Sequence, residues 1–187
     1  MSEQEANENQ GRAILYPLPL SVARIKGLSS GAKMLFARLV FGARGCNLVR
    51  TGAGPLAASL AASKQAIRRW RRDLEKSGLI KVERDGKSYG YHLNRKYTNG
   101  ESIALPAETM ERRDVTRLYK LMLCFLLARQ DGRGCMWASQ KKIARDLGCS
   151  EIGGREVLKA MKAKGEVQVR LRGTSRRQCN EYTLTLG

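Results

Sequence analysis

The residues best suited to binding chemistry lie in one short stretch, SKQAIRRWRRDLEKSG, at positions 63–78. Two pairs of arginines flank Trp70 in this stretch. A guanidinium group can bind a phosphate, or it can donate two hydrogen bonds to the O6 and N7 atoms of guanine. The stretch therefore suggests a helix that reads nucleic acid. A solvated helix face and a tryptophan platform that stacks on bases are the alternatives.

The charge of the whole chain favours a polyanionic partner. Its 187 residues carry 35 Lys and Arg against 17 Asp and Glu, which gives a formal net charge of +18. Nucleic acid is the first partner to consider for such a surplus. A membrane is disfavoured, because the longest apolar block is interrupted by Lys120 and is shorter than the ~18 residues that a span needs. The polar segment 1–12 predicts a disordered lead-in rather than a signal peptide, so we expect a cytoplasmic, nucleoid-associated protein.

The sequence offers little support for metal or enzyme chemistry. The five cysteines form no CxxC motif and His92 is the only histidine, so no standard zinc site is indicated. Cys124 lies in an apolar helical stretch and is expected in the core. There is no GxxxxGK phosphate loop and no recognisable pair of catalytic carboxylates. We therefore expect no catalytic residue, no metal and no cofactor.

The chain overlays on itself when it is shifted by 87 residues. The register holds without a gap until the last strand, where the second copy has four extra residues. This repeat predicts two homologous domains, 13–97 and 101–187, joined by a linker at 98–100. The identical pairs include Pro19 with Pro106, Lys33 with Lys120, Ala57 with Ala144, Ser63 with Ser150, and Gly78 with Gly165.

Each copy shows the element order of a winged helix. In the first copy, Pro55 fits the first turn of a short second helix, Ser63 caps the third helix and Gly78 ends it. We therefore predict an α+β, mainly helical fold of two tandem winged helix-turn-helix domains. The expected elements of the first copy are an extended lead-in at 18–20, a helix from about 30 to 43, a Gly-rich loop at 42–54, the second and third helices, and a hairpin of residues 79–82 and 89–93.

A helical wheel separates two kinds of side chain within the third helix. Ile67, Trp70 and Leu74 share one arc, and Trp70 matches the aliphatic Val157 in the second copy, so we expect the tryptophan to pack inward. The second helix of a helix-turn-helix lies in the major groove with its N-terminal residues nearest the bases. We predict base contacts for Lys64, Gln65, Arg68 and Arg69, and phosphate or wing contacts for Arg71, Arg72, Lys76, Arg84 and Lys87.

The second copy has a weaker reading helix and a longer basic wing. Gly153 and Gly154 each lower helix propensity by about 1 kcal/mol relative to Ala. The apolar Ile152 suits either a thymine methyl group or a protein interface. The second-domain candidates for DNA contact are Ser150, Ile152, Arg155, Lys159, Arg170, Arg172, Arg176 and Arg177.

Two segments of the first copy resemble known helix-turn-helix domains. "LPLSVARIKGLSSGAKMLFARLV", followed by "LAASLAASKQAIRRWRRDLEKSGLIKVE", looks like the domains of plasmid and phage proteins, in which a Leu-Ser-x-x-Ala-Lys helix precedes a Leu-Ala-x-x-Leu-x-x-Ser turn. The match is closer in the first copy than in the second. Two such domains in tandem also resemble plasmid replication initiators of the RepA type. The resemblance implies binding to repeated or palindromic DNA of a mobile element.

The expected function is sequence-specific binding of double-stranded DNA, as a transcriptional regulator or a control factor of a plasmid, phage or integrated element. A replication initiator or partition adaptor is the alternative within DNA biology. An RNA-binding or nucleoprotein-scaffold protein is the alternative from another class. A homodimer or another protein partner also stays open, since the first helix of either copy could support a dimer.

Overall fold

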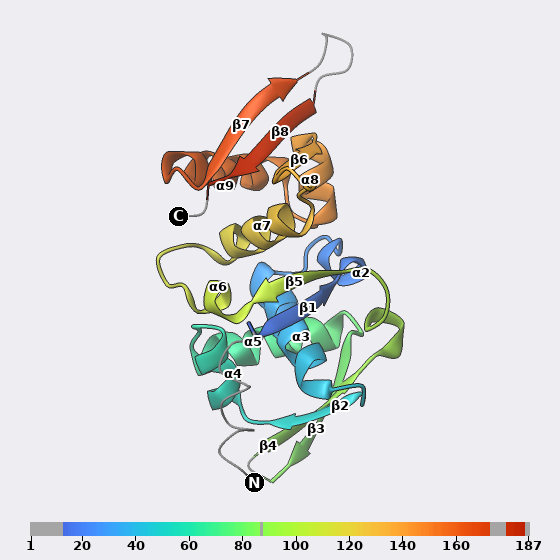
Figure 1. Cartoon of the computed structure of the whole chain (residues 1–187). Helices are drawn as coiled ribbons and strands as arrows, with labels where there is room; N and C mark the ends of the chain where they lie inside the picture. The colour runs from blue at the N-terminus through green and yellow to red at the C-terminus, as the bar shows by residue number, and fades with distance from the viewer. Residues whose placement is uncertain (1–12, 87, 173–178, 186–187) are drawn as a thin grey trace, which may run out of the picture.

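The computed structural model has an α+β fold in which two units repeat the same order of elements (Figure 1). It describes residues 13–86, 88–172 and 179–185. We call 13–97 the first unit and 101–185 the second. The first unit contains β1 (Leu15–Pro19), α2 (Leu20–Ala23), α3 (Ser30–Ala43), β2 (Leu48–Thr51), α4 (Ala53–Ser59), α5 (Lys64–Lys76), β3 (Ile80–Asp85), β4 (Ser88–Leu93) and the 3-10 turn η1 (Arg95–Tyr97).

The second unit confirms the predicted repeat. Each of its helices and strands begins 87 residues after its counterpart, except the last strand, which begins 91 residues after. The elements are β5 (Ser102–Pro106), α6 (Ala107–Glu111), α7 (Arg117–Ala128), β6 (Cys135–Ala138), α8 (Gln140–Asp146), α9 (Glu151–Ala163), β7 (Val167–Arg172) and β8 (Cys179–Leu184).

The ends of α5 and α9, the reading helices predicted for the two copies, are set by the residues that the sequence indicates. Ser63 accepts a hydrogen bond from the backbone amide of Ala66 at 3.1 Å, which caps α5. Ser150 caps α9 in the same way. Gly78 and Gly165 follow these helices with φ of 66° and 72°, a left-handed conformation that glycine adopts without strain.

Each wing is a three-stranded sheet rather than a plain hairpin. The strand orders are β2-β4-β3 and β6-β8-β7, all antiparallel. In the chain, β2 lies between α3 and α4, and β6 lies between α7 and α8. Residues 48–51 fall where the sequence predicts a Gly-rich loop. Only four residues long, β2 is too short for a convincing alternation of apolar and polar positions. It gains its hydrogen bonds from β4, which lies about forty residues further along the chain.

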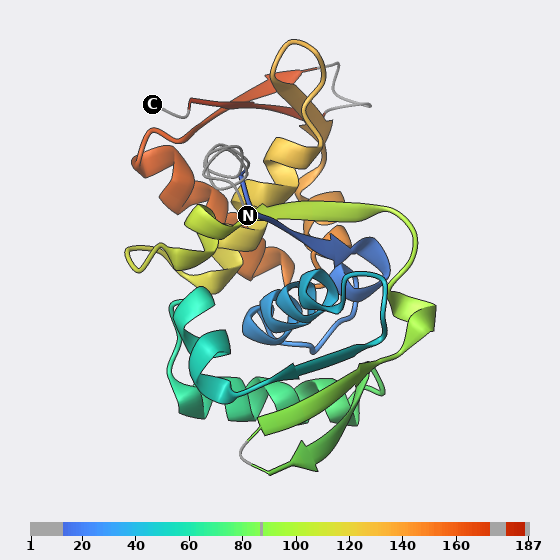
Figure 2. The same ribbon diagram turned by 60° about the horizontal axis from the view of Figure 1, so that its bottom comes forward.

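The two units are joined by a ribbon of their lead-in strands, β1 and β5, which the sequence does not predict. Pro17 pairs with its own repeat counterpart, Ala104. On either side of this pair, Tyr16 lies opposite Leu105 and Leu18 lies opposite residue 103. Since each pair joins positions that exchange under the repeat, the ribbon has a pseudo-twofold axis through its centre. Figures 1 and 2 both show the ribbon between the units, with the two wings at opposite ends of the molecule.

Helix packing and two polar contacts complete the junction. Helices α3 and α7 pack on each other across it, and buried apolar side chains of both units form one continuous cluster. The buried Lys33 donates a hydrogen bond from Nζ to the carbonyl oxygen of Leu147 at 2.7 Å. Arg24 binds the buried carboxylate of Asp146, with Nε 3.1 Å from Oδ1. The division into domains at 98–100 stays a prediction.

Some sequence predictions fall outside the described residues. These are the lead-in at 1–12, Lys87, and the tip of the second wing with Arg176 and Arg177. Within the part of the chain that the structure describes, no helix is long and apolar enough to cross a membrane. Cys124 is buried in α7, as expected, and burial raises the pKa of its thiol to about 12.

Candidate nucleic-acid interface

Helix α5 buries one face in the first unit, as the wheel predicts. Ile67, Trp70 and Leu74 are each no more than 1% exposed. The indole of Trp70 lies so close against Gly31 of α3 that a Cβ atom at position 31 would overlap the ring. The prediction that Trp70 packs inward is therefore confirmed, and the ring has no free face for stacking on a base.

The opposite face of α5 is a continuous basic surface. It consists of exposed polar side chains, and we call it the α5 face. None of its cationic side chains forms a hydrogen bond or ion pair with a residue that the structure describes. The face therefore keeps its full positive charge toward solvent. Its members are Lys64, Gln65, Arg68, Arg69, Arg72 and Lys76.

Arg71 stands apart from the other arginines of the stretch. Its guanidinium carbon lies 4.5 Å from the centre of the Tyr89 ring on β4, and its Nε lies 3.7 Å from a Glu75 carboxylate oxygen. A hydrogen bond from Arg71, together with its positive charge, lowers the pKa of Tyr89. Arg71 thus links α5 to the wing sheet, and its predicted phosphate contact stays a prediction.

The first wing presents fewer free charges. Arg84 is exposed and donates a long hydrogen bond of 3.4 Å to the carbonyl oxygen of Gly86 in the turn. His92 lies on the outer face of the sheet, with Nε2 3.1 Å from Glu83. The hydrogen bond from His92 is the main cause of the lowered pKa of Glu83. His92 therefore serves to pair a carboxylate on the wing.

Helix α9 offers a poorer surface at the matching positions. Ile152 is 73% exposed where α5 has Gln65. Arg155 reaches back to Glu151, with 4.0 Å between nitrogen and oxygen, while Lys159 is exposed without such a partner among the described residues. The hydroxyl of Ser150 is occupied as the helix cap. Glu151 and Glu156 thus stand where α5 carries Lys64 and Arg69.

The second wing mixes charge with an aromatic side chain. Arg172 forms a 2.6 Å ion pair with Glu181, and its guanidinium carbon lies 5.9 Å from the centre of the Trp137 ring. Arg170 is exposed on the same face of the sheet. Of these two arginines, only Arg172 forms an ion pair or a ring contact with described residues.

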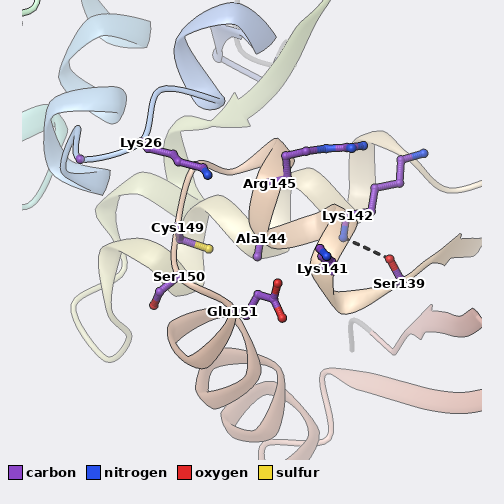
Figure 3. A pocket seen from close by; sticks show the side chains of 11 residues that line it. Lys26, Ser139, Lys141, Lys142, Ala144, Arg145, Cys149, Ser150 and Glu151 are labelled. Carbon is purple, nitrogen blue, oxygen red and sulfur yellow. Dashed lines mark hydrogen bonds between the residues drawn. The ribbon is translucent and has the colours of Figure 1, made fainter.

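The structure also brings together cations that the sequence did not single out. Lys141, Lys142 and Arg145 lie along α8, and Lys26 of the first unit approaches them across the junction (Figure 3). The matching positions in α4 are Gly54, Pro55 and Ala58. This difference between the copies is visible in the sequence. Its importance depends on the proximity of Lys26, which only the fold establishes.

These features define a class of protein: two tandem winged helix-turn-helix units, one of which presents on α5 a basic face whose cations pair with no residue that the structure describes. No family model matches the chain, and no curated protein matches it. Among the described residues, no group of three or more His, Cys, Asp or Glu side chains is arranged to hold a metal ion.

Proposed function

We propose that the protein binds double-stranded DNA sequence-specifically through the α5 face. The observation that carries this proposal is the separation of side chains on α5. Trp70 and its apolar neighbours are buried, whereas Arg68, Arg69 and Arg72 are exposed and unpaired among the described residues. A helix that were merely solvated would gain stability from pairs of opposite charge along its exposed surface.

The geometry of a helix-turn-helix assigns separate roles along α5. Residues near the N-terminus enter the major groove first, so Gln65 can pair with adenine N6 and N7, and Arg68 or Arg69 with guanine O6 and N7. Arg72 and Lys76 lie further along and contact phosphates. Lys64 joins the base-reading group at the first turn. Phosphate contacts place the helix, and the base contacts select the sequence.

The biological role that fits this activity is a transcriptional regulator or a control factor of a plasmid, phage or integrated element, acting in the cytoplasm on the nucleoid. This part of the proposal rests on the resemblance of the helix-turn-helix segments to those of mobile elements. An initiator or partition adaptor would use the same DNA-binding face. Repeated sites at an origin, rather than a site at a promoter, would identify that role.

Selection of bound duplexes from a random library, followed by a protection footprint, tests the proposal. We expect one enriched sequence, with a constant core of the few base pairs that one helix can contact in the major groove. Protection should extend beyond that core where the second unit lies. The same protein should be titrated with a structured RNA of equal length and charge. Absence of an enriched sequence, or equal affinity for the RNA and the selected duplex, would contradict sequence-specific DNA binding.

A further inference from the structure

The junction of the two units contains an open, basic pocket of about 690 Å³. Helix α8 and the turn after it form one side, and Lys26 and Gly27 of the first unit form the other (Figure 3). Because Lys26 comes from a different unit, the pocket exists only when the units are packed as they are here. We call it the junction pocket.

Four cations line the junction pocket against one carboxylate. Lys26, Lys141 and Lys142 are exposed, and their side chains form no hydrogen bond or ion pair with any residue in the described part of the chain. Arg145 lies 3.9 Å from Asp146, a carboxylate that Arg24 already binds at 3.1 Å. The single carboxylate in the lining, Glu151, is 4.0 Å from Arg155. The pocket therefore has a net positive charge that the described residues do not neutralise.

The pseudo-twofold related pocket is also lined by four cations, but among the described residues only Arg113 of these four lacks an ion pair, a hydrogen bond or a ring contact. It lies between the turn at Ala61–Ser63 and the start of the second unit, with a volume of about 560 Å³. Arg112 in its lining is held by Asp114 at 2.8 Å and by Glu166 at 2.9 Å. Arg117 lies over the Trp70 ring, and Lys120 donates to the carbonyl oxygen of Met110. Most of the cations at this second pocket thus already interact with other groups of the protein.

A comparison of the copies shows that only the second unit carries basic residues on the helix before its reading helix. The first unit has them on its third helix and has Gly54, Pro55 and Ala58 on its second. The second unit has Glu151 and Ile152 at the start of α9, and in addition to Arg155 and Lys159 on that helix it carries Lys141, Lys142 and Arg145 on α8. Since a helix that precedes the reading helix crosses the DNA backbone, cations on α8 are suited to phosphates rather than to base edges.

We propose that the junction pocket binds backbone phosphates of the duplex, so that the second unit anchors the DNA while the first unit reads it. This inference rests on the proposed function. Lys141 and Lys142 supply the contacts from the second unit, and Lys26 adds a contact from the first. A phosphate bound between them touches both units, so DNA binding also favours the packed arrangement of the units.

The test compares Lys141→Ala/Lys142→Ala with wild type in equilibrium binding to the selected duplex and to a scrambled one, at several salt concentrations. Each phosphate contact contributes about 0.9 to the slope of log affinity against log salt concentration. We expect the double variant to lose about 2 from this slope, and about tenfold or more in affinity for both duplexes. The base preference should not change. Lys26→Ala alone should reduce the slope by about 1.

The matched control is Arg133→Ala/Lys162→Ala, which removes the same charge at exposed positions outside the pocket. Thermal unfolding of both double variants checks that each is folded. If wild type binds the selected duplex but the two double variants bind it equally well, the junction pocket is not a DNA contact. If wild type binds no duplex at all, the proposed function itself fails.

A further arm separates backbone phosphates from a small phosphate compound. Wild type and the Lys141→Ala/Lys142→Ala variant are titrated calorimetrically with inorganic pyrophosphate. We expect at most weak binding by wild type, which DNA displaces. Tight pyrophosphate binding that the variant loses, with DNA affinity retained, would assign the pocket to a small ligand and overturn the inference.

Discussion

Arg117 of the second unit lies over the indole of Trp70 in the first, with its guanidinium carbon 4.7 Å from the ring centre. Gly31 of α3, in the first unit, also lies close against the ring. Trp70 is therefore held between its own unit and its neighbour, on the helix that carries the α5 face. Through this contact, the packing of the units influences the position of the proposed reading helix.

Removal of Trp70 should destabilise the fold rather than simply reduce DNA affinity. Trp70→Ala is expected to lower the free energy of unfolding by about 3–5 kcal/mol, because a large buried side chain leaves a cavity. A double-mutant cycle of Trp70→Leu with Arg117→Ala should give a coupling of about 1–2 kcal/mol for the cation–π pair. Denaturant unfolding measures both. Wild-type stability of Trp70→Ala together with lost DNA binding would contradict this structural role.

Substitution on the α5 face should alter recognition without altering stability. Arg68→Ala or Arg69→Ala is expected to cost about 1–3 kcal/mol in binding to the selected duplex and to relax the base preference. The matched control is Arg155→Ala, at the position in α9 that corresponds to Arg68. Its effect should be smaller and independent of sequence. If Arg155→Ala relaxes the preference and Arg68→Ala does not, the second unit is the reader.

The turns that precede α5 and α9 make a matched test of the junction. Gly148 has φ of 55°, and a Cβ atom there would lie 2.6 Å from the carbonyl oxygen of Ile25 in the first unit. Its counterpart, Ala61, has φ of 45°. Left-handed strain alone would cost an alanine at this position about 1–2 kcal/mol. Because the backbone must also move, Gly148→Ala should lower the free energy of unfolding by more than this.

Ala61→Gly should have the opposite sign. Relief of left-handed strain at Ala61 is partly offset by the greater entropy of glycine in the unfolded chain, so we expect a change of about 1 kcal/mol or less toward higher stability. Unfolding midpoints of the two variants provide the comparison. If both variants change the unfolding midpoint by similarly small amounts, the units do not pack closely at this turn.

Lys33 should impose a pH dependence on stability. Burial lowers the pKa of its ammonium group from the ordinary value of 10.5 to about 8. Between these values the unfolded chain retains a proton that the folded chain has lost, so stability rises with pH across this window and loses that contribution as pH falls toward 8. Lys33→Met should lack this contribution. Urea unfolding of both proteins from about pH 7 to about pH 10 tests it, and parallel curves would contradict the assignment.

The amino-acid sequence alone determined the repeat, the order of helices and the side of α5 that faces inward. These features are local or periodic. Ser63 and Ser150 cap helices through their own neighbouring amides, and Trp70 could be assigned to the core because the equivalent position is Val157. Exposure of the α5 face follows from the same wheel, so most of the candidate base-reading residues needed no tertiary information.

Only the tertiary structure decided what depends on pairing between distant segments. Strand β2 is defined by β4, and the β1–β5 ribbon by a pairing of residues 87 positions apart on average, which no local pattern encodes. The approach of Lys26 to Lys141 and Lys142 has the same origin. Side-chain periodicity reports which face of a helix is apolar, but the partner of that face, and the pocket formed beside it, are set by long-range packing.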